Sequence, residues 1–224
     1  MGDTSRRYKI FLSYPIYERP HPKSIDSLER LRTKTKLAEL CYSSIRGDSD
    51  IVRVRNIEIS RFINSVNDFD YFMTWDSDIE ILGDDSIDRM IRYNVPFLGL
   101  LVSKTALVKD KLASVPMEIN PQNIKKDMGL IKMRWLGAGV TLIHRDAIMK
   151  MAETCTDVHY DLPNHNMKGY ALYSKMIIDF NGIRKELSED WAFCERFRKV
   201  IGDIYADTSI VTVHHGDYGY RIFE

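Results

Sequence analysis

The chain has 224 residues and a hydrophobic fraction of 44%, which is the composition of an ordinary globular protein. Its 32 Lys and Arg residues balance 32 Asp and Glu residues, so no overall field favours nucleic acid or an anionic membrane as a partner. Its three cysteines, Cys41, Cys155 and Cys194, form no CxxC pair. This argues against a disulfide framework or a zinc site and favours a reducing compartment.

The N-terminal residues lack the apolar segment of a signal peptide, and the longest apolar run, residues 95–102, is too short to span a bilayer. We therefore expect no transmembrane segment and a soluble, intracellular protein of the cytoplasm. The length fits one α/β domain of generous size or two very small ones. Because no repeat or linker interrupts it, we expect a single domain over residues 1–224, which could also be one module of a longer chain.

The first hundred residues alternate apolar strand patterns with amphipathic helix patterns. Expected strands are residues 8–13, 51–54, 71–75 and 97–102, and expected helices are residues 24–45, 57–66 and 86–93, the first with Ser24 as its N-cap. This alternation predicts an α/β fold with a twisted, mostly parallel central sheet flanked by helices. In such sheets a ligand binds beyond the carboxyl ends of the strands.

The second half of the chain is less regular and predicts a smaller mixed or antiparallel part. Residues 104–128 are polar and loop-like, and residues 155–175 suit an irregular surface. The elements expected there are strands at 140–144, 204–205 and 210–213, a helix at 145–153, and a helix opening after Ser188.

Two carboxylates, Asp76 and Asp78, follow the apolar strand expected at residues 71–75. In a strand, residues two apart project to the same side, so these carboxylates can converge on one ligand. Like charges held that close repel each other unless a cation lies between them, and oxygen ligands suit Mg²⁺ or Mn²⁺. A solvated turn is the alternative, since Asp is a common turn former. An EF-hand loop fails, because its required Gly and Glu would fall at Ile81 and Ile87.

Several motifs, in order along nearly the whole chain, resemble the GT-A family of nucleotide-sugar glycosyltransferases. A fainter likeness is to glycosyltransferase domains of large DNA viruses. The matching pieces are Ser13-Tyr14-Pro15, Arg55-Asn56, Asp76-Ser77-Asp78, Gly137-Ala138-Gly139, Ser188-Glu189-Asp190-Trp191 and His214-His215-Gly216.

This resemblance implies a GT-A-like fold with a nucleotide-binding half, about residues 1–103, and an acceptor-binding half, about residues 104–224. It implies transfer of a sugar, of the hexosyl type, from a nucleoside-diphosphate sugar to a glycan or other hydroxyl acceptor, with UDP favoured and no nucleic acid involved. Its nucleotide-binding residues would be Ser13, Tyr14, Pro15, Arg55, Asn56, Asp76 and Ser77.

The resemblance also implies a metal site formed by Asp78, His214 and Asp76, the last contacting either the metal or the ribose. Manganese is favoured over magnesium, because imidazole is a better ligand for Mn²⁺. We favour His214 over His215 because its spacing to Gly216 fits the family pattern. The ion would act as a Lewis acid on the departing nucleoside diphosphate.

The catalytic carboxylates implied by the resemblance are Asp190 and Glu189. A carboxylate in the first turn of a helix is stabilised as an anion and can take a proton from an acceptor hydroxyl. Simple charging of a helix N-terminus is the alternative reading of these two residues. Whether the anomeric configuration is inverted or retained stays open. Residues expected to contact the sugar or acceptor are Trp135, Gly137, Ala138, Gly139 and Trp191.

Two other functions compete with glycosyl transfer. Haloacid-dehalogenase-type phosphatases also place a DxD after a buried strand, but normally the first strand, with Thr or Val where this chain has Glu80. A non-catalytic nucleotide- or sugar-binding module is the other alternative, and the intact Glu189-Asp190-Trp191 segment argues against it.

Overall fold

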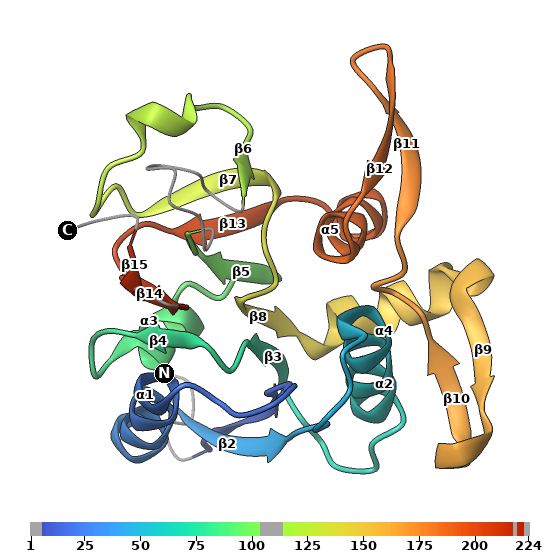
Figure 1. Cartoon of the computed structure of the whole chain (residues 1–224), viewed down its shortest axis with the longest axis horizontal. Helices are drawn as coiled ribbons and strands as arrows, with labels where there is room; N and C mark the ends of the chain where they lie inside the picture. Colours follow the sequence, from blue (N-terminus) through green and yellow to red (C-terminus); the bar gives the residue numbers. More distant parts are fainter. Residues whose placement is uncertain (1–5, 104–113, 217–218, 222–224) are drawn as a thin grey trace.

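The structure is a computed structural model that describes residues 6–103, 114–216 and 219–221. A central sheet of eight strands runs through the molecule (Figure 1). In spatial order the strands are β2 (Ala38–Ser43), β1 (Tyr8–Ser13), β3 (Tyr71–Trp75), β8 (Val140–His144), β5 (Phe97–Leu100), β13 (Ile204–Asp207), β7 (Leu130–Trp135) and β6 (Val115–Pro116).

The sheet is mostly parallel, as predicted. Strands β2, β1 and β3 run in the same direction, β8 runs antiparallel between β3 and β5, and β5 and β13 are parallel again. Strand β7 is antiparallel to both β13 and β6. Only β8 and β7 therefore run against the other strands of this sheet, and the predicted fold class is confirmed.

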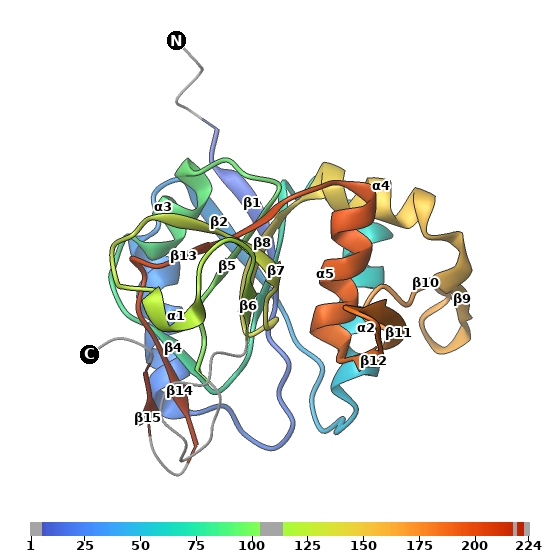
Figure 2. The same ribbon diagram turned by 90° about the horizontal axis from the view of Figure 1, so that it is seen from above.

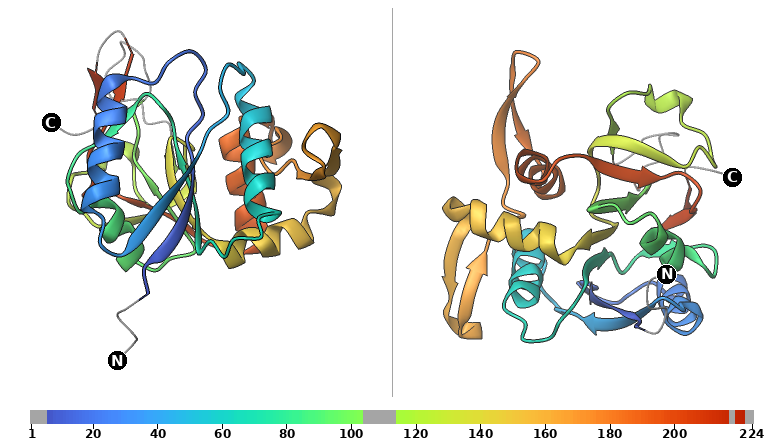
Figure 3. Two further views of the ribbon diagram at one scale, coloured as in Figure 1. Left: turned by 90° about the horizontal axis from the view of Figure 1, so that it is seen from below. Right: turned by 180° about the vertical axis from the view of Figure 1, so that it is seen from behind.

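Helices cover both faces of this sheet (Figures 2 and 3). The five α-helices are α1 (Pro22–Lys34), α2 (Ile51–Ile63), α3 (Ser86–Arg92), α4 (Arg145–Thr154) and α5 (Glu189–Val200). Helices α1 and α3 contribute apolar side chains to one core, whereas α2, α4 and α5 contribute to the other. Each core is closed because an amphipathic helix buries its apolar stripe against the apolar face of the sheet.

Strand β3 shows how the sequence builds two cores at once. All five of its residues are buried. Tyr71, Met73 and Trp75 belong to the core under α1 and α3, while Phe72 belongs to the core under α2, α4 and α5. Because alternate side chains of a strand point to opposite faces, a strand covered on both faces has a continuous apolar sequence.

Smaller antiparallel units surround the sheet, mostly in the second half of the chain, as predicted. They are a three-stranded unit of β15 (Gly219–Tyr220), β14 (Thr212–His215) and β4 (Ile79–Ile81), and two hairpins, β9 (His159–Leu162) with β10 (Met167–Tyr170) and β11 (Met176–Phe180) with β12 (Ile183–Leu187). The two hairpins extend away from the sheet (Figure 1). Short 3₁₀ helices are η1 (Pro121–Asn123), η2 (Thr156–Val158) and η3 (Pro163–His165).

The predicted second strand is wrong, and so is the long helix before it. Helix α1 ends at Lys34 and is capped by His21 instead of Ser24. Strand β2 occupies residues that we assigned to the end of that helix, and residues 51–54 begin helix α2. The apolar residues Leu37 and Leu40 fit a helical period, but the backbone from Ala38 onward pairs in parallel with β1, and both side chains pack into the core that contains α1 and α3.

Other elements match the prediction closely. Strands β1, β3 and β8 have the predicted bounds, and α3, α4, α5 and β5 lie within two residues of theirs. Strands β4, β6, β7, β11, β12 and β15 were not predicted, and residues 155–175, expected as an irregular surface, contain the β9–β10 hairpin. The predicted loop at 104–128 lies partly outside the described residues. Within the described part of the chain, no helix is long and apolar enough to cross a membrane.

We predict that Ile148→Ala lowers the free energy of unfolding by about 2–5 kcal/mol, the usual cost of removing a fully buried aliphatic side chain. Ile148 lies on α4 and is 0% exposed. The matched control is Ile25→Ala on α1, where the side chain is 39% exposed and the loss should stay below about 1 kcal/mol. Urea denaturation measures both, and equal losses would contradict the assignment of α4 to the core.

Candidate active site

The Asp76-Ser77-Asp78 segment forms a tight turn between β3 and β4. The backbone carbonyl of Asp76 accepts a hydrogen bond from the amide of Ile79 at 3.1 Å. The backbone amide of Asp76 donates to the carbonyl of Gly139 at 2.8 Å. The indole Nε1 of Trp75 donates to the carbonyl of Ile79 at 2.7 Å, which pins the turn from inside the core. Our expectation that strand geometry aligns the two carboxylates is therefore wrong, since the strand ends at Trp75.

Both carboxylates nevertheless line one cavity of about 200 Å³ at this edge of the sheet. Its wall contains Pro15, Asp76, Ser77 and Asp78 from the predicted site. The same wall includes four residues that we did not predict, Tyr17, Asp48, Ser49 and Ile51. Asp48 and Ser49 follow β2, so a correct assignment of that strand would have placed them at a carboxyl end and identified them.

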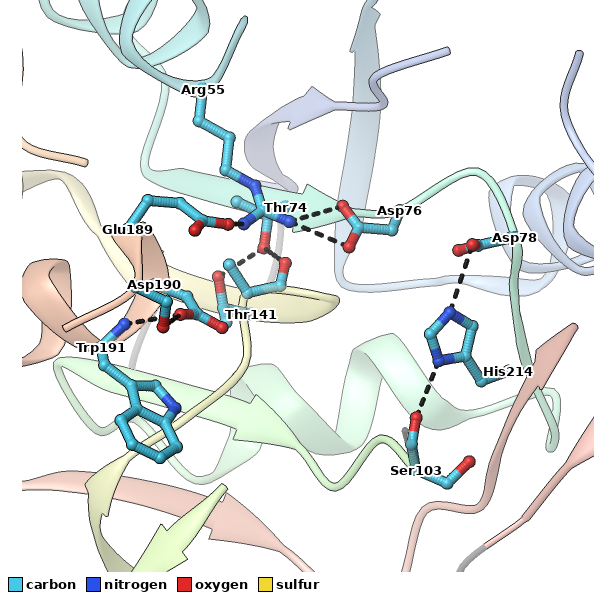
Figure 4. A network of polar contacts seen from close by, with 12 residues as sticks. Arg55, Thr74, Asp76, Asp78, Ser103, Thr141, Glu189, Asp190, Trp191 and His214 are labelled. Atoms are coloured by element: carbon cyan, nitrogen blue, oxygen red, sulfur yellow. Dashed lines mark hydrogen bonds and ion pairs between the residues drawn. The ribbon is translucent and has the colours of Figure 1, made fainter. Parts of the chain in front are cut away.

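Arg55 connects the turn to the start of helix α5. Its Nη2 donates to both carboxylate oxygens of Asp76, at 3.0 and 2.9 Å, and its Nη1 donates to Glu189 Oε1 at 2.7 Å (Figure 4). The side chain is only 6% exposed. Burial alone would lower the pKa of Arg55, but the charges of Asp76 and Glu189 outweigh it and raise the pKa above its usual value.

The sequence predicted that Arg55 binds the nucleotide, whereas the structure shows it paired with two carboxylates. Its guanidinium is used on Asp76 and Glu189, so in this structure it does not face the cavity as a ligand for a diphosphate. Burial raises the pKa of Asp76, and the Arg55 guanidinium opposes this shift by favouring the carboxylate. Asn56, next to it on α2, is also buried, and its Oδ1 accepts a hydrogen bond from the amide of Tyr173 at 2.8 Å.

Asp78 faces His214 from the other side of the turn. The His214 Nε2 atom lies 3.2 Å from Asp78 Oδ2, and its Nδ1 lies 2.7 Å from the carbonyl oxygen of Ser103 (Figure 4). A carbonyl oxygen can only accept, so Nδ1 carries a hydrogen. In the neutral ring, Nε2 therefore presents a lone pair to the carboxylate of Asp78, and this contact needs a proton or a metal cation between the two atoms.

The pKa of His214 agrees with a proton or a metal cation between Nε2 and Asp78. Burial would lower the pKa of His214, but its hydrogen bonds with Asp78 and with the Ser103 carbonyl raise the pKa above its usual value. A histidine that binds a metal commonly donates its second ring N–H to a backbone carbonyl, which is the arrangement of His214 and Ser103.

A divalent cation therefore fits the donors of Asp78 and His214. Among the described residues, no group of three or more His, Cys, Asp or Glu side chains is gathered as a metal site. Two protein ligands are enough for Mg²⁺ or a similar hard ion, which completes its shell with water and substrate phosphate oxygens. Asp76, whose oxygens both accept from Arg55, is the least available of the three predicted ligands.

Glu189 and Asp190 lie in the first turn of α5, as predicted. Asp190 Oδ1 accepts hydrogen bonds from the Ser188 hydroxyl and, at 2.8 Å, from the amide of Trp191. The described residues donate no hydrogen bond to its other oxygen, Oδ2. Glu189 is bound to Arg55, so these neighbouring carboxylates are not equivalent. Asp190 is therefore the one of these two carboxylates that Arg55 does not bind.

The predicted sugar-contacting residues are buried, except for Trp191, which is half-buried. Trp135 is 1% exposed, donates from Nε1 to Glu195 at 2.8 Å and stacks on Trp191 with ring centroids 4.6 Å apart. The Lys185 ammonium lies over both indole rings. In this structure, Trp135 has no exposed ring face for a sugar, because its indole is large enough to fill the space between β7 and α5.

The Gly137-Ala138-Gly139 segment supports the end of β3 through its backbone. The hydroxyl of Thr74 donates to the carbonyl of Ala138 at 2.7 Å, and the carbonyl of Gly139 accepts from Asp76. A Cβ atom on Gly139 would lie 2.6 Å from Ile79 Cδ1, so a larger residue there would require the Ile79 side chain to shift. The backbone of this segment thus positions the turn that begins at Asp76.

Of the opening motif, only Pro15 reaches the cavity wall. Ser13 and Tyr14 are each 1% exposed, and the Tyr14 hydroxyl is 2.8 Å from that of Ser24. Both residues are buried at the end of β1, next to Pro15, and do not line the cavity.

Comparisons with known proteins add the fold and nothing more specific. No protein-family model matches the sequence, and no curated protein matches it. The chain is similar to the crystal structure of A197 from STIV, with a TM-score of 0.59 and 16% identity over 96% of this chain and 90% of that chain. At this identity the similarity shows that the two proteins share a fold.

A weaker similarity is to a glycosyltransferase involved in the glycosylation of the major capsid of PBCV-1. Its TM-score is 0.36 at 13% identity, covering 63% of this chain and 62% of that chain. We base no argument on this second similarity.

We predict that Arg55→Gln lowers the free energy of unfolding by about 3–5 kcal/mol, because it leaves two partly buried carboxylates without a counter-charge. Adding Glu189→Gln to this variant should recover part of the loss. The control is Arg6→Gln, which removes an exposed ion pair with Asp70 and should cost about 0–1 kcal/mol. Urea denaturation compares the variants, and equal losses for Arg6 and Arg55 would contradict the role of Arg55.

Proposed function

We propose that this protein is a metal-dependent glycosyltransferase. It moves a sugar, of the hexosyl type, from a nucleoside-diphosphate sugar, with UDP favoured, to a glycan or other hydroxyl acceptor. The observation that carries the proposal is the pair of Asp78 and His214, whose Nδ1 is held by a carbonyl so that Nε2 and a carboxylate face each other beside a cavity. This pair lies on an α/β fold and within the ordered motifs that resemble the GT-A family.

The donor would bind in the cavity that Asp76, Ser77 and Asp78 share with Tyr17 and Ser49. Asp78 and His214 would hold Mn²⁺ or Mg²⁺, which as a Lewis acid stabilises the negative charge of the departing diphosphate. Asp76, held by Arg55, fixes the turn and can accept a hydrogen bond from a ribose hydroxyl. Tyr17 is exposed at the wall of the cavity and can pack against a base or ribose.

Asp190 is the proposed general base. Its Oδ1 is held by Ser188 and by the amide of Trp191, so its orientation is fixed while Oδ2 stays free to take the acceptor proton. The N-terminal turn of α5 stabilises the carboxylate as an anion before reaction. Glu189 supports this arrangement from the neighbouring position by its ion pair with Arg55.

The same contacts weigh against the phosphatase alternative. A haloacid-dehalogenase-type enzyme would use Asp76 as its nucleophile. Both oxygens of Asp76 accept hydrogen bonds from Arg55, which lowers the nucleophilicity of the carboxylate. We therefore keep glycosyl transfer as the proposed function, and the binding and turnover experiments below separate it from a non-catalytic module.

We predict that UDP stabilises the protein against thermal unfolding only when Mn²⁺ or Mg²⁺ is present. A ligand at 100 times its Kd adds about 2.7 kcal/mol to the free energy of unfolding, which is a clear thermal shift. Asp78→Asn and His214→Gln should each abolish this metal-dependent shift. The control Asp161→Asn, an exposed carboxylate on β9 outside the cavity, should leave it unchanged. Equal stabilisation by UDP with and without metal would contradict the metal site.

We also predict that Asp190→Asn lowers the rate of sugar transfer by about 10²–10⁴-fold, the usual contribution of a general base. Nucleotide affinity should stay within about twofold of the unchanged protein, because Asp190 does not line the donor cavity. Turnover of UDP-sugars to UDP, measured over a panel of hydroxyl acceptors and with water, provides the rate. An Asp190→Asn variant with full turnover would rule out this role.

A further inference from the structure

A second, larger cavity of about 420 Å³ lies beside the proposed donor cavity. Its walls come from the loop after β2, from helix α2 and from the turn between β9 and β10. A volume of this size is in the range of pockets that bind small ligands, roughly 300–1,000 Å³. Nothing in the transferase mechanism proposed above uses this cavity.

Side chains with basic groups, three arginines and one histidine, line this second cavity from all three segments. Arg53 and Arg61 lie eight residues apart on α2, with Ile57 halfway between them, so the three residues lie on one stripe of the helix. Arg46 comes from the loop after β2, and His165 comes from the β9–β10 turn. Three arginines from residues 46–61 thus line the same cavity as His165, which lies more than a hundred positions later in the sequence.

The charge of this cavity is not balanced by its walls. Asp48 is the only carboxylate in the lining, and it is bound by Arg53 through Nε at 2.7 Å and Nη2 at 2.6 Å. Arg61 pairs with Glu58, which is 0% exposed and lies outside the lining. Arg46 makes no side-chain hydrogen bond or ion pair with any described residue. With Asp48 bound to Arg53 and Glu58 bound to Arg61, the remaining positive charge of the cavity is that of Arg46.

The position of the cavity relates it to the proposed active site. Asp48 and Ser49 line both this cavity and the one that contains Asp76 and Asp78. The two hollows are therefore neighbours separated by one short loop. A ligand bound in the second cavity can extend across this loop toward the donor.

We propose that the second cavity binds an anionic group of the acceptor, a phosphate, sulfate or carboxylate carried on a sugar. Arginine suits this task, because its planar guanidinium donates paired hydrogen bonds to oxyanions. A concave site with one sign of charge also concentrates anions from solution. The assignment of the ligand as the acceptor rests on the proposed transferase function, whereas binding of an anionic sugar does not.

Isothermal titration calorimetry with four sugars tests this proposal on the full chain. The probes are glucose 6-phosphate, glucose 6-sulfate, glucuronate and neutral glucose. We expect saturable binding of at least one anionic sugar and none of glucose, and the anion bound most tightly identifies the group that the acceptor carries. Arg46→Gln should weaken this binding about tenfold, equal to about 1.4 kcal/mol. It should leave the urea midpoint unchanged, because Arg46 contributes to the fold through its backbone bridge with Ile16, which the substitution keeps.

The control is Arg184→Gln, which removes an exposed arginine of β12 outside both cavities and should leave binding unchanged. Asp78→Asn should also leave binding of the anionic sugar unchanged while abolishing metal-dependent UDP binding. If UDP fails to bind but an anionic sugar binds through Arg46, the proposed function is wrong and the anion site stands. Failure of all three anionic sugars, insensitivity to Arg46→Gln, or displacement of the anionic sugar by UDP would overturn the anion site.

Discussion

The candidate active site depends on one buried guanidinium. Arg55 leaves helix α2, crosses the end of β3 and binds the carboxylates of Asp76 and Glu189 at once. These three residues come from segments up to 134 positions apart, so the contact can form only when α2, the β3–β4 turn and α5 are all in place. A buried ion pair of this kind adds little net stability over an apolar replacement, but removing one partner is costly. We infer that its main effect is to fix the geometry of the site.

The contact with Arg55 places the two DxD carboxylates, Asp76 and Asp78, in different surroundings. Asp76 is held by Arg55 and fixes the turn, whereas Asp78, 48% exposed at its side chain, faces His214 and the cavity. The same contact distinguishes the two carboxylates of α5, because Arg55 binds Glu189 and does not bind Asp190. A single arginine thus leaves one carboxylate of each pair available for ligand chemistry. The proposed division between metal binding by Asp78 and proton transfer by Asp190 follows from it.

The fold could be predicted where local sequence and tertiary burial agree. The run of apolar residues at 71–75 is long enough for a buried central strand and was identified correctly, whereas the turn that follows it stood only as the alternative to strand geometry. Strand β2 was missed because Leu37 and Leu40 continue the spacing of helix α1, and only pairing with β1 decides between the two. That error also moved Arg55 from a helix to the end of a strand, and it hid Asp48 and Ser49.

The site could be predicted in its acidic residues but not in their partners. The order of the motifs pointed to Asp76, Asp78, Asp190 and His214, and the structure gathers them around one edge of the sheet. No local pattern shows that Arg55 would bind Asp76 and Glu189, 21 and 134 positions away, since hydrogen bonds between separate elements leave no periodic signal. The burial of Trp135 was missed for the same reason, because Trp191 and Glu195 cover it from a distant helix.

The most direct test is a crystal of the protein with UDP and Mn²⁺, with manganese located by its anomalous scattering. Our account predicts one manganese ion bound by Asp78 and by Nε2 of His214, while both oxygens of Asp76 remain on Arg55. Manganese on Asp76 with Arg55 displaced, or an ordered nucleotide remote from His214, would contradict it.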